Sequence, residues 1–337
     1  MVITQTPFRM SFFGGGTDFP GFFEKYGGSV ISTTFDKYCF VTVSHLPRFF
    51  DYKNQITYSR IERTNTVDEI EHPAVRKAME YLDMHELRMI YEADLPARSG
   101  LGTSSSFAVG MINAFYALKG KYADKMQLAR DAIYVERTLC KESGGVQDQL
   151  AASFGGLNRI NFSSEEYVVN PLIIPKERKQ LLNDNLMLFF TGFSRFSSDI
   201  AKSQERATRD KTQELKETLT LVDEAEKILT SRESLDEFGK LLDYAWKIKR
   251  GITNKISNDS INNIYEHALE AGALGGKLLG AGGGGFLLFY VEKDKQNAVR
   301  KALNNLLYVP FEFENGGTRV LYYKSEDFDI DSVRKEI

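Results

Sequence analysis

The sequence predicts an α+β protein of two domains. Its 337 residues are too many for one hydrophobic core of ordinary size and suit two. Segments of strand composition and segments of helical spacing follow one another along the chain, without a repeat of fixed period. We expect an N-terminal domain over residues 1–172 and a C-terminal domain over residues 173–337, with the crossing between them at 170–175.

The bulk composition is typical of a globular protein of the reducing cytoplasm. Hydrophobic residues make up 42% and charged residues 26%, and a net charge of -3 does not favour nucleic acid as a partner. Cys39 and Cys140 lie far apart, and the four histidines show no ligand spacing, so neither a disulfide framework nor a Cys/His metal site is expected. The N-terminus lacks the pattern of a signal peptide, and no apolar run reaches about 18 residues, so we expect no membrane partner. We expect a monomer or a homodimer.

The N-terminal half opens with an apolar strand that carries Arg9. The β-rich segments 29–34 and 39–44 flank a short link at 35–37, which predicts a hairpin or two adjacent strands. Apolar residues recur on one face of the segment 73–84, as in an amphipathic helix. The other elements expected here are a strand at 87–92, helices at 107–118 and 125–140, and a strand at 157–162.

The C-terminal half predicts further strands and helices. Residues 186–191 form an apolar run that suits a buried strand. A long polar helix is expected over 197–231, with Ser197 or Ser198 as its N-cap and Asp199 in its first turn. The other elements expected here are helices at 235–249, 261–271 and 296–307, and strands at 286–291, 311–313 and 319–323.

The glycine- and serine-rich segment 99–106 lies between a predicted strand and a predicted helix. Backbone N–H groups at such a helix start, together with the positive end of the helix dipole, favour a phosphate. The hydroxyl groups of Thr103, Ser104 and Ser105 could add hydrogen bonds or bind Mg²⁺. The alternative is a turn whose serines only cap the helix, and the segment by itself leaves both interpretations open.

The glycine run at 280–285 formally matches the dinucleotide fingerprint GxGxxG. That fingerprint opens a helix, whereas a strand follows here, so a dinucleotide-binding fold is excluded. Glycine is entropically costly, so the run indicates a close approach of the backbone to a ligand or to another segment, or tight packing against a helix. The Walker P-loop motif and the protein-kinase motifs HRD and DFG do not occur.

The segment 12–18 follows the opening strand, in which Arg9 is a lone charge among apolar neighbours. A buried charge without a partner is expensive, so Arg9 needs a carboxylate, and Asp18 is one candidate. A purely structural salt bridge is the alternative.

Taken in order, three segments resemble the motifs of the GHMP kinases, the family of galactokinase, homoserine kinase, mevalonate kinase and phosphomevalonate kinase. They are TPFRMSFFGGGTDF (6–19), DLPARSGLGTSSSFAVG (94–110) and KLLGAGGGGF (277–286), and they span most of the chain. The resemblance implies the two-domain GHMP kinase fold, with an N-terminal domain like domain 2 of ribosomal protein S5 and a ferredoxin-like C-terminal domain. It also implies ATP and Mg²⁺ as cofactors.

Within the family, GGGTDF and the run GGVQDQLAASFGG (144–156) are most similar to the sugar-1-kinase branch, which includes the D-glycero-α-D-manno-heptose 7-phosphate kinases. This similarity implies transfer of the γ-phosphate of ATP to the anomeric hydroxyl of a sugar phosphate. The acceptor implied is D-glycero-D-manno-heptose 7-phosphate, which would give the 1,7-bisphosphate. Other activities of the family stay open, namely a fucokinase, a galactokinase-like enzyme or a mevalonate-pathway kinase. A regulator on the same fold that binds a sugar or nucleotide without transfer also stays open.

The resemblance also implies roles for single residues. Asp148 matches the catalytic aspartate, and Arg9 matches the basic residue that pairs with it. Ser104 and Glu136 match the two metal ligands. The residues implied to bind the ATP phosphates are Ser99, Gly100, Leu101, Gly102, Thr103, Ser104, Ser105 and Ser106. Those implied to line the acceptor site are Gly15, Gly16, Thr17, Asp18, Gly282, Gly283 and Gly284.

A phosphorylated acceptor would also need a cation to bind its phosphate. Arg195 is the best candidate, because its loop at 192–198 precedes a predicted helix start. Arg98 and Lys202 are the other candidates. A solvated surface side chain is the alternative for each of them.

Overall fold

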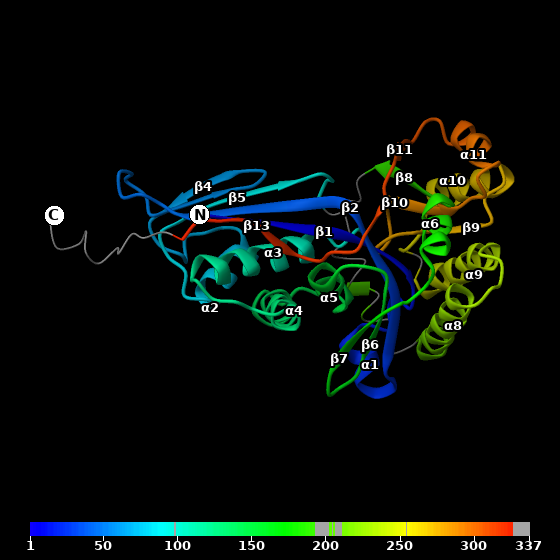
Figure 1. Cartoon of the computed structure of the whole chain (residues 1–337), viewed down its shortest axis with the longest axis horizontal. Coiled ribbons are helices and arrows are strands. Elements are labelled where there is room, and N and C mark those ends of the chain that lie inside the picture. The colour runs from blue at the N-terminus through cyan, green and yellow to red at the C-terminus, as the bar shows by residue number, and fades with distance from the viewer. Residues whose placement is uncertain (98, 193–201, 204, 206–210, 254, 326–337) are drawn as a thin grey trace.

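The computed structural model describes residues 1–97, 99–192, 202–203, 205, 211–253 and 255–325. Figure 1 shows an elongated molecule, with a large sheet and its helices at one end and a smaller sheet with its own helices at the other. The large sheet has nine strands, of which six follow the order β13-β1-β2-β5-β3-β4. Its strands are β1 (Val2–Phe13), β2 (Gly28–His45), β3 (Asn54–Thr57), β4 (Ile61–Thr64), β5 (Leu87–Ala93), β6 (Asn158–Phe162), β7 (Tyr167–Pro171), β12 (Phe313–Glu314) and β13 (Arg319–Tyr323).

Strand β2 is one continuous strand, so the prediction of two strands joined by a link at 35–37 is wrong. Pro7 of β1 pairs with Tyr38 of β2, and the next residue, Phe8, pairs with Phe35. The two residues between Phe35 and Tyr38 therefore form a bulge. A bulge bends a strand without ending it, which is why polar residues in mid-strand resembled a turn.

Helices pack against one face of the large sheet. They are α2 (Pro73–Tyr81), α3 (Thr103–Leu118), α4 (Lys125–Ile133) and α5 (Gln147–Phe154), and the short α1 (Pro20–Tyr26) follows β1. The helix predicted at 125–140 is present, but its end is a π-helical segment, η1 (Tyr134–Leu139). The core between helices and sheet includes Val41, Met89 and Phe115, all fully buried.

The small sheet has the order β11-β8-β10-β9, with all neighbours antiparallel. Its strands are β8 (Leu186–Gly192), β9 (Gly275–Leu278), β10 (Gly285–Tyr290) and β11 (Leu307–Val309), and the helices of this half are α6 (Lys176–Asp184), α8 (Thr212–Thr230), α9 (Asp236–Ile252), α10 (Asp259–Glu270) and α11 (Gln296–Ala302). The helix predicted at 296–307 is shorter, because residue 307 already begins β11. Ser197, Ser198 and Asp199, the expected start of the long helix, lie outside the described residues.

The two sheets share a hydrophobic core. Phe12 and Phe13, at the end of β1, pack edge-on against Phe238 of α9, with ring centroids 5.4 and 5.1 Å apart. The opening strand therefore delivers the segment after it to the junction between the two halves.

The chain returns to the large sheet at its end. Strand β12 pairs with β2, and β13 pairs with β1. The predicted C-terminal domain over residues 173–337 is thus not a single unit in space, since its last strands extend the first sheet. The division at residue 172 itself stays a prediction. In the described part of the chain, no helix combines the length and the apolar character needed to cross a membrane.

Candidate active site

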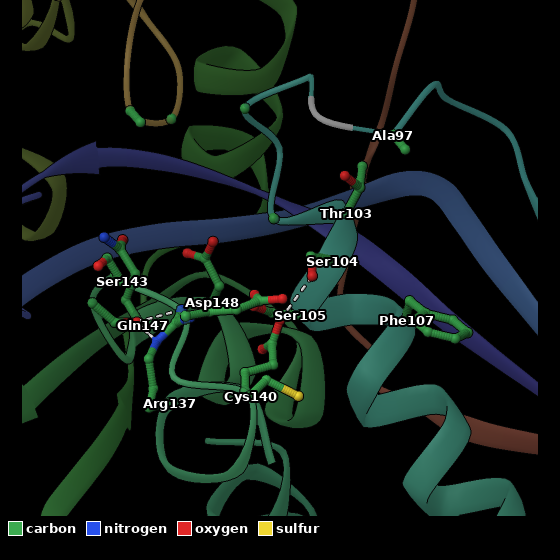
Figure 2. A pocket seen from close by; sticks show the side chains of 18 of the residues that line it. Ala97, Thr103, Ser104, Ser105, Phe107, Arg137, Cys140, Ser143, Gln147 and Asp148 are labelled. Carbon is green, nitrogen blue, oxygen red and sulfur yellow. Dashed lines mark hydrogen bonds between the residues drawn. The ribbon is translucent and has the colours of Figure 1, made fainter. Parts of the chain in front are cut away.

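A cleft of about 1180 Å³ opens where the end of β1, the start of α3, the start of α5 and the loop after β9 come together. Ligand pockets for one drug-sized molecule are typically 300–1,000 Å³, so this cleft has room for two small molecules. It is lined by residues from all three motifs, among them Arg9, Gly102 and Gly280. Figure 2 shows Asp148 and Gln147 on one side of it and Thr103 and Ser104 at the start of α3 on the other.

Arg9 and Asp148 form an ion pair in the cleft. The Nε and Nη2 atoms of Arg9 donate to Oδ1 and Oδ2 of Asp148 at 2.7 and 2.6 Å. The third guanidinium nitrogen, Nη1, donates to the carbonyl of Gly100 at 2.9 Å. Arg9 is 4% exposed, and its partner is Asp148 rather than Asp18. A two-point contact of this kind fixes the direction of the carboxylate.

The segment 99–106 turns sharply before α3. Gly102 has a left-handed backbone, with φ of 72°, and a Cβ placed on it would lie 3.3 Å from Oδ2 of Asp148. The helix start and the carboxylate are therefore neighbours in space. Among the predicted phosphate-binding residues, those that line the cleft are Gly100, Gly102, Thr103, Ser104 and Ser105.

Three other residues predicted to bind phosphate do not line the cleft. Leu101 is fully buried in the core, and its carbonyl accepts a hydrogen bond from the backbone N–H of Arg9. The hydroxyl of Ser106 donates to the carbonyl of Pro7 at 2.9 Å. Ser99 is 1% exposed, and its backbone packs against Gly285. The Leu101 carbonyl and the Ser106 hydroxyl thus help to hold the turn in place, and a role of these three residues in phosphate binding stays a prediction.

Ser104 and Glu136 meet at the edge of the cleft. The hydroxyl of Ser104 donates to Oε1 of Glu136 at 2.8 Å, and Nε2 of Gln149 donates to Oε2 at 2.6 Å. Glu136 is 1% exposed and sits in the π-helical segment η1, a geometry often found at functional sites. Among the described residues, no group of three or more His, Cys, Asp or Glu side chains could hold a metal ion. A hydroxyl and a carboxylate still fit Mg²⁺, which is usually bound by few protein ligands and completed by phosphates and water.

Asp18 lies on the other side of the cleft and is 2% exposed. Its Oδ1 accepts from the N–H of Gly16 at 2.9 Å, and its Oδ2 accepts from Nε2 of Gln147 at 2.9 Å. Burial raises the pKa of Asp18, the Gly16 hydrogen bond partly offsets this, and the charge of Asp148 raises the pKa further. Gly15 and Gly16 also line the cleft.

Three of the residues predicted to line the acceptor site, Thr17, Gly282 and Gly283, contact the backbone of other segments. The hydroxyl of Thr17, fully buried, bonds to the backbone of Gly14 and Ser29. A Cβ on Gly282 would lie 2.7 Å from the backbone of Ile256, and the N–H of Gly283 donates to the carbonyl of Ile256. The described lining contains Gly280 and Ala281 of this loop but none of the predicted Gly282, Gly283 and Gly284. Thr17 and Gly282 are buried, and a role of Thr17 and these three glycines in the acceptor site stays a prediction.

Two lysines that the motifs did not identify as site residues also line the cleft. Nζ of Lys249, on α9, donates to the carbonyl of Gly280 at 2.6 Å. Nζ of Lys277 donates to the carbonyl of Phe12 at 2.6 Å. Lys277 is part of the third motif, so the sequence could have identified it as a candidate site residue. Lys249 lies on a helix that carries charges of both signs, and no motif in the sequence identifies it as a site residue.

Four aromatic side chains were missed as well, at the end of the cleft beyond α3. His72 packs against Tyr58 and Phe107 with ring centroids 5.0 and 5.4 Å apart, and Tyr91 packs against Phe107 at 4.8 Å. Burial lowers the pKa of His72. Its Nδ1 is buried and has no hydrogen-bond partner in the described part of the protein.

Of the three candidates for binding the phosphate of an acceptor, Arg195 and Arg98 lie outside the described residues. Lys202 is described, is exposed and lines the cleft.

Comparisons with known proteins agree with this geometry. Two family models match the chain, "GHMP kinases N terminal domain" over residues 67–156 and "GHMP kinases C terminal" over residues 199–309. A D-glycero-alpha-D-manno-heptose 7-phosphate kinase of Campylobacter jejuni is 30% identical over 319 residues, which cover 89% of this chain and 92% of that protein. A bifunctional fucokinase/GDP-fucose pyrophosphorylase of Arabidopsis thaliana is 27% identical over 245 residues, covering 69% of this chain and 22% of that protein. The crystal structure of a D-glycero-D-manno-heptose 1-phosphate kinase from Bacteriodes thetaiotaomicron has a TM-score of 0.72 at 25% identity, over 96% of this chain and 100% of that one. This chain therefore belongs to the GHMP kinase family.

Proposed function

We propose that the protein is an ATP-dependent sugar kinase that phosphorylates the anomeric hydroxyl of a sugar phosphate. The acceptor proposed is D-glycero-D-manno-heptose 7-phosphate, and the product is the 1,7-bisphosphate. One observation carries the proposal: the Asp148 carboxylate, held at both oxygens by Arg9, lies against Gly102 at the start of α3. Such an arrangement brings an acceptor hydroxyl to a bound phosphate chain.

The two ends of the cleft support ATP as the phosphate donor. At the start of α3, backbone N–H groups and the helix dipole favour phosphate oxygens. Beyond α3, the rings of Tyr58, His72 and Phe107 form an apolar wall that suits a purine base.

Ser104 and Glu136 are the residues that would hold Mg²⁺. Their oxygens are 2.8 Å apart and belong to the ligand class that Mg²⁺ prefers. When bound, the metal would neutralise the charge that builds up on the phosphate oxygens. Gln149 keeps the second oxygen of Glu136 occupied and so fixes the carboxylate for this role.

Phosphoryl transfer requires positioning more than covalent help from the protein. The acceptor oxygen forms a bond to the γ-phosphorus, the bond from that phosphorus to the bridging oxygen breaks, and ADP leaves. The hydroxyl proton passes to Asp148 and from there to solvent. Because Arg9 is bound to both oxygens of this carboxylate, Asp148 contributes at least as much through orientation as through base strength.

The acceptor would lie between Asp148 and Asp18, both of which line the cleft. The Asp18 carboxylate could accept hydrogen bonds from sugar hydroxyls. The similarity to a heptose 7-phosphate kinase supports a phosphorylated sugar, whose phosphate would be bound by Arg195 or Lys202. We also propose a reducing cytoplasm as the location, because Cys39 and Cys140 are both free thiols.

The test is coupled ADP release with D-glycero-D-manno-heptose 7-phosphate, compared with unphosphorylated heptose and hexoses. We expect the phosphorylated heptose to give a kcat/KM at least about 10²-fold higher, since loss of a charged contact costs several kcal/mol. The position of the new phosphate is read by ³¹P NMR. Equal rates with unphosphorylated sugars would contradict the phosphorylated acceptor, and ADP release that no sugar stimulates would contradict a sugar kinase.

A further inference from the structure

The ammonium group of Lys249 lies where the two glycine-rich loops meet. Lys249 donates to the carbonyl of Gly280 at 2.6 Å. A Cβ on Gly280 would be 2.4 Å from Cα of Gly100, so the two loops are in direct contact. On the other side of this contact, Arg9 donates to the carbonyl of Gly100 at 2.9 Å. Two cations from different halves of the molecule therefore bind neighbouring loop carbonyls at the cleft.

Arg9 and Lys249 differ in how far neighbouring groups neutralise their positive charge. Arg9 has a full carboxylate partner in Asp148. Lys249 donates to the carbonyls of Gly280 and, at 3.4 Å, of Leu278, and within the described ranges it makes no ion pair. A carbonyl dipole compensates a shielded charge less than an anion does. The site around Lys249 is thus electrostatically incomplete without a negatively charged ligand.

Its surroundings lower the pKa of Lys249 to about 8, chiefly through burial and then through repulsion by Arg9, while Asp18 acts in the opposite direction. The pKa of Lys277 is lowered well below its usual range by burial and by the charges of Lys249 and Arg9. At neutral pH the positive charge remains on Lys249, whose side chain is partly exposed to the cleft.

We propose that Lys249 binds a phosphoryl group in the cleft and so connects the C-terminal half of the protein to the reaction site. This inference rests on the proposed function, because it needs phosphorylated ligands in this cleft. A lysine ammonium is a point charge with three donors and is well suited to phosphate oxygens. Binding would add an anion between Lys249 and the start of α3, which is the contribution that the carbonyl partners do not supply.

Two phosphoryl groups could occupy this position, the γ-phosphate of ATP or the phosphate of the acceptor. The position of Lys249 at the contact of Gly100 and Gly280 favours the γ-phosphate, since Gly100 precedes the helix start that would hold the triphosphate. The two sources share their chemistry, and paired ligands that differ by one phosphoryl group separate them.

The experiment is calorimetric titration of the whole protein with Mg²⁺ and four ligands: AMP-PNP, ADP, D-glycero-D-manno-heptose 7-phosphate and the unphosphorylated heptose. The variant is Lys249→Met, which keeps most of the side-chain volume. The matched control is Lys247→Met, two residues along the same helix, whose ammonium pairs with Asp243 at 2.6 Å. We expect Lys249→Met to weaken AMP-PNP at least about 10-fold and to leave ADP unchanged, the scale of one charge-assisted contact.

A loss confined to the phosphorylated heptose would assign Lys249 to the acceptor phosphate. Unchanged binding of all four ligands, or an equal loss for all four, would overturn the proposal. Lys249→Arg keeps the charge and should retain the difference in affinity between AMP-PNP and ADP. If Lys249→Arg binds normally, the position tolerates substitution, and the loss in Lys249→Met is due to the missing charge rather than to unfolding. If the wild-type protein binds neither nucleotide, the kinase proposal itself fails, and that result is distinct from normal binding that Lys249→Met does not change.

The pH dependence gives a second readout. Only the charged lysine attracts an anion, so the affinity for AMP-PNP should fall as pH rises through about 8. Between pH 7 and pH 9 the expected loss is about 10-fold, because one proton is linked to binding. Ionisation of the ligand phosphate is the same for every variant, so the comparison with Lys249→Met over the same pH range removes it. The charged groups that interact with Lys249 are Arg9, Asp18 and Lys277. A fall of the same size in Lys249→Met would assign the effect to another group and overturn the proposal.

Discussion

Both carboxylate oxygens of Asp148 accept hydrogen bonds from the guanidinium of Arg9, at 2.7 and 2.6 Å. Arg9 in turn is tied to the carbonyl of Gly100. The direction of the carboxylate is therefore set by the backbone of the opposite loop, and this connects the proposed acceptor site to the proposed phosphate site through three groups.

Replacing Asp148 with asparagine keeps the shape of the side chain but removes its charge. We expect kcat to fall about 10²-fold or more, the usual contribution of a positioned acid–base group, with little change in KM for ATP. Steady-state ADP release measures both constants, and a thermal melt checks that the fold persists. Turnover close to that of the wild-type enzyme would remove Asp148 from the mechanism.

Replacing Arg9 with lysine keeps the positive charge but not the two-point contact. A lysine presents a point charge and cannot bind both carboxylate oxygens and the Gly100 carbonyl in one plane. We expect kcat to fall about 10²-fold, since small misplacements of a positioning group cost that much. The double variant with Asp148→Asn should be no slower than Asp148→Asn alone, because groups that act as a unit are not additive. If the fold-loss of kcat in the double variant equals the product of the two single losses, Arg9 acts independently of Asp148.

The α+β fold and the family could be predicted because the information is local. Each of the three motifs is a continuous run of residues, and their order along the chain was sufficient; the family models and the structural match confirm both. The pairing of Arg9 with Asp148 was predicted from the resemblance, whereas Arg9 by itself indicated only the need for a carboxylate, with Asp18 as one candidate. The sequence could not decide between two carboxylates that both lie in the cleft.

The features that the sequence did not predict depend on contacts between segments that are far apart in the chain. Lys249 becomes a site residue only because α9 lies beside the loop at Gly280, and nothing in its own helix indicates this. The glycines at 282–284 were expected at the acceptor site from the resemblance, whereas the segment that Gly282 and Gly283 approach is the backbone at Ile256. A run of glycines indicates a close contact, but it does not identify the group that makes this contact. The same holds for β2, where a bulge and a turn contain similar residues.

The contact between Ser104 and Glu136 predicts a defect specific to the metal. Ser104→Ala and Glu136→Gln should each raise the Mg²⁺ concentration needed for half-maximal activity at least about 10-fold, as loss of a metal ligand or its support does. The measurement is a Mg²⁺ titration of ADP release at saturating ATP. Ser106→Ala is the matched control: its hydroxyl binds the carbonyl of Pro7, so it should lower stability by about 1 kcal/mol without changing the Mg²⁺ requirement. A normal Mg²⁺ requirement in both Ser104→Ala and Glu136→Gln would contradict their role.

Gly145 offers a way to move Asp18 without changing a single polar group. A Cβ at this position would lie 1.8 Å from Oδ2 of Asp18, so alanine forces that carboxylate away from its hydrogen bond with Gln147. We expect KM for the sugar to rise at least about 10-fold with KM for ATP unchanged, since Asp18 is proposed to contact the acceptor alone.

The control is Gly251→Ala, where no atom lies within 4 Å of the added carbon and kinetics should be normal. Gln147→Met removes the side-chain donor to Asp18 and should shift KM in the same direction. This variant separates displacement of the carboxylate from general damage to the loop. A rise in KM for ATP that equals the rise for the sugar would place Asp18 outside the acceptor site.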